Sequence, residues 1–294
     1  MGFEHKFLQL LLAGIGTGAI YALIGVGFNV IYKSTGAMNF AQGEWVMGGG
    51  MVGAMLFNTA HFPVWAACLG AVAAVTAAGI ASEFIVIRPI RHPTAVLITL
   101  VTIGLAICTK SLVMLSLGKL PTGYPPFSGE TPILVLGASV HPQTIWILGI
   151  TALFMAGTHY FFQHTMLGKA MRAAAADRQA ATLVAINTRR VVMWSFAVAA
   201  MAGGVAGVII TPLTFTSYDA GTMLGFKGFS AAMVGGLGSL HGAVLGGLLL
   251  GVLEALASGY LSSQFKDAIA FLALLAVLFA MPTGLVGSRE IERV

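Results

Sequence analysis

The sequence predicts an all-α membrane protein that crosses the bilayer several times. Of the 294 residues, 57% are hydrophobic and only 9% are charged, whereas soluble domains carry about 25% charged residues. Many of the apolar runs approach the ~20 residues that a helix needs to cross the hydrocarbon core. Basic residues lie in the short connections between these runs, which is the positive-inside pattern. We expect a single transmembrane domain over residues 1–294.

Nine apolar segments are candidate membrane spans. They are residues 7–32, 45–57, 63–87, 94–117, 143–162, 191–211, 222–237, 242–261 and 268–281. Segments 45–57 and 222–237 are short and Gly-rich, which is typical of re-entrant, tilted or broken helices. We therefore expect about eight full crossings, with nine possible. Segment 7–32 is too long for the core of a cleaved signal peptide, so we expect a permanent first helix.

The charged connections predict the orientation. The connection 164–190 is the most basic and should face the cytoplasm. Arg88, Arg91 and the tail residues Arg289 and Arg293 are expected on the same side. This arrangement places the N-terminus outside, together with the Pro-rich connection 118–142. That connection is either a plain link or a docking surface for an external partner.

Small residues recur at four-residue spacing along several apolar segments. Such spacing lets helix backbones approach closely in lipid, so we expect packing within the bundle, with a dimer seam as the alternative. The pairs are Gly14 and Gly18, Gly49 and Gly53, Gly203 and Gly207, and Gly247 and Gly251. Cys68 and Cys108 lie inside apolar runs, and we expect two buried free thiols.

Residues 166–187 consist mostly of Ala, Leu, Met, Lys, Arg and Gln, which are strong helix formers. The segment is too polar to span lipid and too regular for a loop. We expect one helix, or two short ones, on the cytoplasmic face. Physical reasoning leaves two interpretations open, because such a helix fits either a groove of another protein or a surface of anionic lipid.

Two acidic residues lie within long uncharged stretches. Glu44 follows Asn39 and Gln42 at the start of a Gly-rich segment, and Glu254 lies in the middle of segment 242–261. A charge at bilayer depth costs at least about 2.5 kcal/mol, so such residues usually face a pathway or a polar partner. Asn39, Gln42, Glu44 and Glu254 are therefore candidate pathway or gating residues. Structural hydrogen bonds, and for Glu254 a salt bridge to a neighbouring helix, are the alternative.

A glycine-rich break, GGLGSLHGAVLGG, separates two apolar segments at residues 235–247. Transporters use such breaks to expose backbone groups to ligand, so Gly236, Gly238 and Ser239 are candidate pathway residues. A tight turn between helices is the alternative. We also expect Asn29 to hydrogen-bond across helices.

Enzymatic chemistry and nucleic-acid binding find little support in the sequence. A P-loop is absent, so ATP hydrolysis by that route is excluded. Ser239 and His241 lie two residues apart with no orienting acid close in sequence, which argues against a serine protease. The seven histidines are scattered, and we predict no metal and no cofactor. The basic residues follow the membrane pattern and not that of a nucleic-acid surface.

Several blocks together resemble the LivH-type permeases of branched-chain amino acid ABC transporters. They are GAIYALIGVGFNVIY (18–32), MNFAQGE (38–44), GKAMRAAAADRQAATLVAIN (168–187), GGLGSLHGAVLGG (235–247), YLSSQFKDAIAF (260–271) and MPTGLVG (281–287). The match covers nearly the whole chain in the right order. The sequence departs from the family pattern at His241, where a proline is expected, and at Ala185, where a glycine is expected.

The resemblance implies a transport subunit of the bacterial inner membrane that carries hydrophobic amino acids and leaves ATP hydrolysis to other chains. It implies that residues 168–187, within a cytoplasmic coupling segment 166–190, dock on one of two ATP-binding subunits. A second homologous permease and a periplasmic amino-acid-binding protein complete the system. The candidate coupling residues are Gly168, Lys169, Arg172, Asp177 and Arg178. The rival readings are a permease for urea or short amides, an ATP-independent secondary transporter, and a channel or scaffold.

Overall fold

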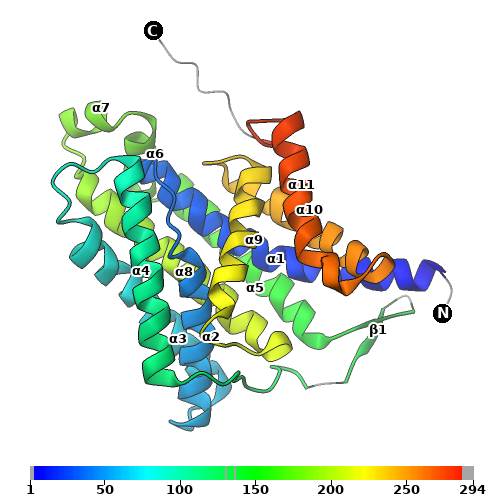
Figure 1. Ribbon diagram of the computed structural model, residues 1–294. Helices are drawn as coiled ribbons and strands as arrows, with labels where there is room; N and C mark the ends of the chain where they lie inside the picture. The colour runs from blue at the N-terminus through cyan, green and yellow to red at the C-terminus, as the bar shows by residue number, and fades with distance from the viewer. Residues whose placement is uncertain (1–2, 130, 136, 287–294) are drawn as a thin grey trace.

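The computed structural model describes residues 3–129, 131–135 and 137–286. Each of the nine predicted segments contains a helix (Figure 1). These helices are α1 (Phe3–Thr35), α2 (Gln42–Asn58), α3 (Val64–Ser82), α4 (Ala95–Leu117), α5 (Pro142–His164), α8 (Thr188–Thr214), α9 (Ala220–Gly235), α10 (Leu240–Tyr260) and α11 (Lys266–Ala280). A π-helical stretch, η1 (Glu83–Ile87), continues α3, and a short 3-10 turn, η2 (Ser263–Phe265), precedes α11. The tail residues Arg289 and Arg293 lie outside the described residues.

Within the described residues, six helices are long and apolar enough to cross a membrane: α1, α3 with η1, α4, α5, α8 and α10. The other three are shorter, because α2, α9 and α11 have 17, 16 and 15 residues. The sequence predicted the shortness of α2 and α9 but not that of α11. The chain is therefore a multi-pass membrane protein that combines long spans with short helices.

The outer helices present apolar side chains away from the bundle. Along α4, Leu112 and Leu115 are 66% and 79% exposed. Helix α8 is mostly buried in contrast, with its Gly- and Ala-rich middle packed against α1, α2 and α3. Exposed leucines on a helix of this length are stable only against lipid or another apolar surface.

Cys108 on α4 is free and exposed, so the prediction that both thiols are buried is wrong for this residue; Cys68 is free and buried.

Glycines allow the backbones of α1 and α10 to pack closely along a shared seam. A Cβ atom at Gly18 would lie 2.8 Å from the Gly247 carbonyl oxygen, and one at Gly14 would lie 2.7 Å from Val252 Cα. Gly251 faces Gly18 in the same seam. The predicted packing of these small residues within the bundle is confirmed.

Helices α2 and α9 both begin inside the bundle. The segment before α2 turns back from the end of α1, and the Phe40 amide donates to Thr102 Oγ1 of α4 at 3.1 Å. From there α2 runs to the far end, where Asn58 Nδ2 donates to the Gly123 carbonyl at 3.0 Å. The first turn of α9 meets the first turn of α2, because Gly221 packs on Gly43. The re-entrant, tilted or broken character expected for this pair stays a prediction.

Two short helices, α6 (Met166–Ala176) and α7 (Arg178–Leu183), stand at one end of the bundle (Figure 1). This arrangement confirms the prediction of a helical segment, in its two-helix form. The C-terminal end of α1 lies beside α6, and Ile87 packs with Ile31 and Val192 at the same end. The connection with Arg88 and Arg91 therefore lies at the α6 end, as predicted.

The Pro-rich connection lies at the opposite end and is more ordered than a plain link. It contains a short antiparallel hairpin that the sequence analysis did not predict, formed by β1 (Ile133–Val135) and β2 (Ala138–Val140), with Leu134 opposite Ser139. The hairpin packs beside the N-terminal end of α1 (Figure 1). Tyr124 is buried and donates its hydroxyl to the Val208 carbonyl. Burial raises the pKa of the Tyr124 hydroxyl, which keeps it protonated as a donor.

Candidate functional site

A cluster of charged side chains lies inside the bundle between α9, α10 and α11. Lys227 Nζ lies 2.7 Å from Glu254 Oε1 and 2.6 Å from Asp267 Oδ1. The Tyr21 hydroxyl donates to Glu254 Oε2 at 2.7 Å. The side chains of Lys227 and Glu254 are only 6% and 9% exposed, whereas Asp267 is 38% exposed. Glu254 thus forms the salt bridge that was the structural alternative to a pathway role.

The sequence analysis did not single out Lys227 or Asp267. Lys227 is the one charged residue within segment 222–237, and Asp267 immediately precedes segment 268–281. An ionisable residue inside or next to an apolar run is a functional-site candidate on its own, and this rule would have found both. Their pairing could not be predicted, because Lys227, Glu254 and Asp267 belong to three separate helices.

Glu44 lies at the place where α2 meets α9. It is 3% exposed, and Glu44 Oε1 accepts a hydrogen bond from Thr222 Oγ1 at 3.3 Å. Asn39 and Gln42 are fully buried beside it; Gln42 Nε2 donates to the Ala199 carbonyl at 2.9 Å. Glu44 Oε2, Gln42 Oε1 and Asn39 Nδ2 have no hydrogen-bond partner among the described residues. Buried polar atoms in this state are rare in folded proteins, so the junction stays a candidate gating site.

The glycine-rich break forms a tight turn between α9 and α10. Gly236 and Gly238 have positive φ angles of 107° and 77°, which a glycine adopts without strain. Asn29 of α1 holds the turn: its Nδ2 donates to the Ser239 carbonyl at 2.8 Å and its Oδ1 accepts from the Gly238 amide at 3.1 Å. The expected cross-helix role of Asn29 is confirmed, and the turn geometry matches the structural alternative for this segment.

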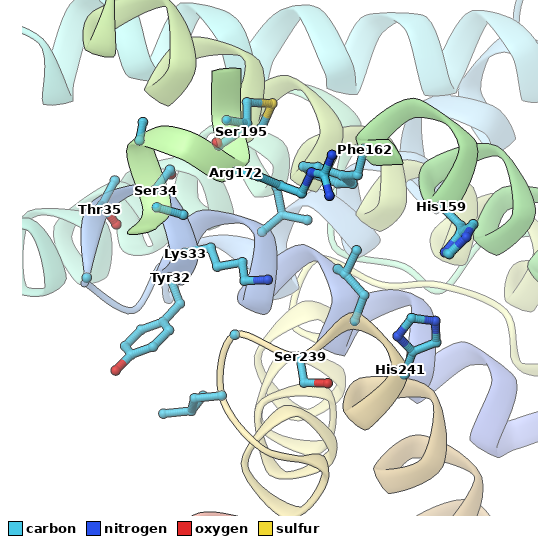
Figure 2. Close-up of a pocket in the computed structure, with 18 of the residues that line it drawn as sticks. Tyr32, Lys33, Ser34, Thr35, His159, Phe162, Arg172, Ser195, Ser239 and His241 are labelled. Atoms are coloured by element: carbon cyan, nitrogen blue, oxygen red, sulfur yellow. The ribbon is translucent and has the colours of Figure 1, made fainter. Parts of the chain in front are cut away.

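A cavity of about 760 Å³ lies at the α6 end of the bundle (Figure 2). Lys33 of α1 and Arg172 of α6 reach toward the same space, with His159 and His241 at one side (Figure 2). Among the described residues that line this cavity, every charged side chain is basic, and Arg178 is the third. Gly238 and Ser239 line it as well, so the structure brings these two candidate pathway residues together with two of the coupling residues.

The coupling residues divide into buried and exposed members. A Cβ atom at Gly168 would lie 2.6 Å from Phe162 Cα, so glycine allows α6 to pack on the end of α5. Lys169, Arg172 and Arg178 are exposed, and Arg172 Nη1 donates to Gln163 Oε1 at 2.9 Å. Asp177 caps α7, because its Oδ1 accepts from the Gln179 and Ala180 amides at 2.8 and 2.9 Å. Asp177 therefore has a structural role that sequence reasoning missed.

The far side of the coupling segment is apolar. Leu183 and Val184, at the end of α7, are 87% and 70% exposed, and Met166 at the start of α6 is 82% exposed. Ala174 is buried against the bundle, so the alanine run contributes to the inner face as well as to the outer surface. Large apolar side chains near exposed basic ones suit a protein contact and also a surface of anionic lipid, so both interpretations stay open.

The structure gives no support to the rejected chemistries. Ser239 accepts from the Gly242 amide at 3.0 Å as the N-cap of α10. Its neighbour His241 faces His159, with ring centroids 5.6 Å apart. Within the described residues, no group of three His, Cys, Asp or Glu side chains could hold a metal ion. The absence of a resident metal stays a prediction.

The fold and these sites define a class: a polytopic membrane permease with short helices that begin inside the bundle and a helical segment exposed at one end. Residues 10–278 match the family described as "Branched-chain amino acid transport system / permease component". The chain belongs to this family.

Curated relatives resemble the chain over nearly its whole length. It is 36% identical to the high-affinity branched-chain amino acid transport system permease protein LivH of Salmonella typhimurium, covering 98% of each chain. It is 35% identical to LivH of Escherichia coli, again over 98% of each chain, and 33% identical to BraD of Pseudomonas aeruginosa over 99% of each. The solved structure of PsaBC from Streptococcus pneumoniae in complex with Fab shares the fold, with a TM-score of 0.52, 11% identity and coverage of 95% of this chain and 93% of that one.

Proposed function

We propose that the chain is the membrane-embedded permease subunit of a bacterial ABC importer for branched-chain or related hydrophobic amino acids. In this proposal it lies in the inner membrane and hydrolyses no ATP itself. The observation that carries the proposal is the nearly full-length similarity to permease proteins of branched-chain amino acid transport systems. The exposed segment α6–α7 supports it, because a subunit without an ATPase needs a surface on which a motor can act.

The proposed complex contains a second homologous permease, two cytoplasmic ATP-binding subunits and a periplasmic amino-acid-binding protein. One of the two ATP-binding subunits docks on α6 and α7 of this chain, where Arg172, Arg178 and Leu183 are exposed. The binding protein docks at the opposite end, where Pro125 and Pro126 line a cavity of about 610 Å³. The ordered Tyr124 contact holds this surface in place.

Transport follows from a two-state bundle whose equilibrium is biased from one end. ATP binding moves the docked subunits and displaces α6, which packs against the C-terminal part of α1. Asn29 joins the Gly238 turn to α1. The junction of α2 and α9 around Glu44 lies within the bundle and is the proposed gate.

Charge reversal at Arg172 tests the coupling role. Arg172→Glu changes an exposed side chain that donates to the neutral side chain of Gln163, so we expect insertion into the membrane to stay normal. We expect amino acid uptake in vesicles to fall by about tenfold, within the range of a ~1–3 kcal/mol coupling free energy, while ATP hydrolysis by the associated subunits persists. Arg91→Glu is the matched control, because Arg91 is exposed at the same end outside α6 and α7.

Asp177 needs two variants because it also caps α7. Asp177→Asn keeps an acceptor for the Gln179 and Ala180 amides, whereas Asp177→Lys removes it. If the charge matters for coupling, both variants lose uptake; if only the cap matters, Asp177→Lys alone does. Normal uptake by Arg172→Glu together with both Asp177 variants would rule out α6–α7 as the coupling segment.

A further inference from the structure

A second cavity, of about 600 Å³, lies toward the end of the bundle opposite α6. It is bounded at that end by Pro121, by His141 before α5 and by the segment that follows α8. Its size is in the ordinary range of small-molecule sites, ~300–1,000 Å³.

The walls of this cavity differ sharply in chemistry. One part is aliphatic, formed by Ile20 of α1, Ile147 of α5, Ile210 of α8, and Met223 and Leu224 of α9. Another part carries the charged residues Lys227, Glu254, Lys266 and Asp267. Two positive and two negative side chains balance to zero, so this part of the cavity suits a ligand that carries both charges.

The charged residues are not equally available to a ligand. Lys227 and Glu254 are almost fully buried and bind each other, and the Tyr21 hydroxyl occupies the second oxygen of Glu254. Asp267 is 38% exposed, and Lys227 lies 2.6 Å from its Oδ1. A carboxylate can accept about four hydrogen bonds in all, so Asp267 retains acceptor capacity for a donor in the cavity. Lys266 is exposed next to it.

We propose that this cavity binds one α-amino acid in its zwitterionic form, with an aliphatic side chain. The ammonium group of the ligand donates to Asp267, its carboxylate accepts from Lys266, and its side chain packs on the wall of Ile20, Ile147 and Ile210. Lys227 is a positioning residue that holds Asp267, with Glu254 balancing its charge. This inference rests on the proposed transport of hydrophobic amino acids, and it assigns a substrate site within a single permease chain.

Binding of radiolabelled L-leucine tests the proposal. The full-length chain, with any subunits that co-purify, is placed in nanodiscs without a binding protein. We expect saturable L-leucine binding. The competitors 4-methylpentanoate, which lacks the amino group, and 3-methylbutylamine, which lacks the carboxylate, should each compete at least about tenfold more weakly, because each loses one charge-assisted contact.

Two variants assign the contacts separately. Asp267→Asn should weaken L-leucine by about tenfold and leave 4-methylpentanoate unchanged. Lys266→Gln should weaken L-leucine to a similar extent and leave 3-methylbutylamine unchanged. A general folding defect would weaken all three ligands together, so this crossed pattern is specific to the site. Asp219→Asn is the control, because Asp219 is an exposed carboxylate that does not line this cavity.

Three results would overturn the site: no saturable L-leucine binding to the wild-type chain, equal competition by the single-charge analogues, or unchanged L-leucine binding in both variants. Uptake of L-leucine into vesicles that contain the whole transport system tests the proposed function separately. Normal uptake together with any of these results removes the site and leaves the transport function standing. Absence of L-leucine uptake by the complete wild-type system would instead refute transport of this substrate.

Discussion

At the scale of single residues, Ala185 occupies a position that favours glycine. Its φ angle is +60°, a left-handed conformation that costs an L-residue ~1–2 kcal/mol. The surrounding bonds explain why: the Ile186 amide donates to the Ala181 carbonyl at 3.0 Å and the Ala185 amide to the Thr182 carbonyl at 3.1 Å. This is the Schellman ending of a helix, which usually has glycine at that point. The departure noted in the sequence therefore has a structural consequence at the end of α7.

Replacing Ala185 by glycine should stabilise the end of α7. Ala185→Gly removes the left-handed strain and is expected to raise the free energy of local unfolding by about 1 kcal/mol. Limited proteolysis of the segment after α6 measures this change, and the variant should be cut more slowly. Ala180→Gly, inside α7, should be cut faster because glycine is a poor helix former. Faster cutting of Ala185→Gly would contradict the strain.

Glu254 is the more buried of the two carboxylates that neutralise the buried charge of Lys227. In Glu254→Gln, Lys227 keeps only Asp267 as a charged partner. We expect the free energy of unfolding to fall by about 2–3 kcal/mol, which is less than the ~3–5 kcal/mol for a wholly unpaired buried charge. We also expect uptake to weaken. Thermal unfolding in detergent and vesicle uptake measure the two effects, with Asp219→Asn as the control. Unchanged values in both assays would make Glu254 dispensable.

At the scale of helices, hydrophobic runs located α1 to α5 and α8 to α11, because lipid requires apolar segments with satisfied backbones. The sequence analysis did not recognise segment 268–281 as short. Its helix, α11, has 15 residues and falls short of a full crossing. The hairpin of β1 and β2 was missed because strands of three residues leave no alternating pattern to detect. Side-chain pairs across helices, such as Lys227 with Glu254, could not be predicted from the sequence. The spacing of residues within one segment carries no information about which residue of another helix they contact.

The seam of α1 and α10 depends on the absence of a side chain at Gly18. A methyl group there would meet the Gly247 carbonyl oxygen and Leu248 Cα, each at 2.8 Å. We expect Gly18→Ala to lower the free energy of unfolding by about 1–3 kcal/mol, the usual cost of overpacking, measured by thermal unfolding in detergent. Gly149→Ala on α5 meets nothing within 4 Å and should be neutral or stabilising. Equal stability of the two variants would exclude a close seam.

At the scale of the whole molecule, the charged connections predicted which segments share an end. The connection with Arg88 and Arg91 lies at the α6 end, and His5 near the N-terminus lies against Gly137 of the hairpin turn at the other. The candidate site was predicted only in part. Glu254, Glu44 and the Gly238 turn were identified, but they form separate groups, and their partners come from helices far apart in the sequence.

Labelling of single cysteines tests the orientation of the whole bundle. In a chain with Cys68 and Cys108 changed to alanine, Leu183→Cys should react with an impermeant maleimide only from the cytoplasmic side. Leu120→Cys should react only from outside. Both leucines are more than four-fifths exposed, at 87% and 82%, so access is not limited by burial. The reverse pattern would invert the orientation and exclude ATPase docking on α6–α7.

The three contacts of Asn29 have a mechanical consequence. One amide group on α1 binds the Gly236 and Ser239 carbonyls and the Gly238 amide, so three hydrogen bonds tie the linker between α9 and α10 to α1. A shift of the final turns of α1 must drag this linker with it, and the linker leads directly into the helix that carries Glu254. We therefore expect movement at the α6 end of the bundle to reach α10 through this linker.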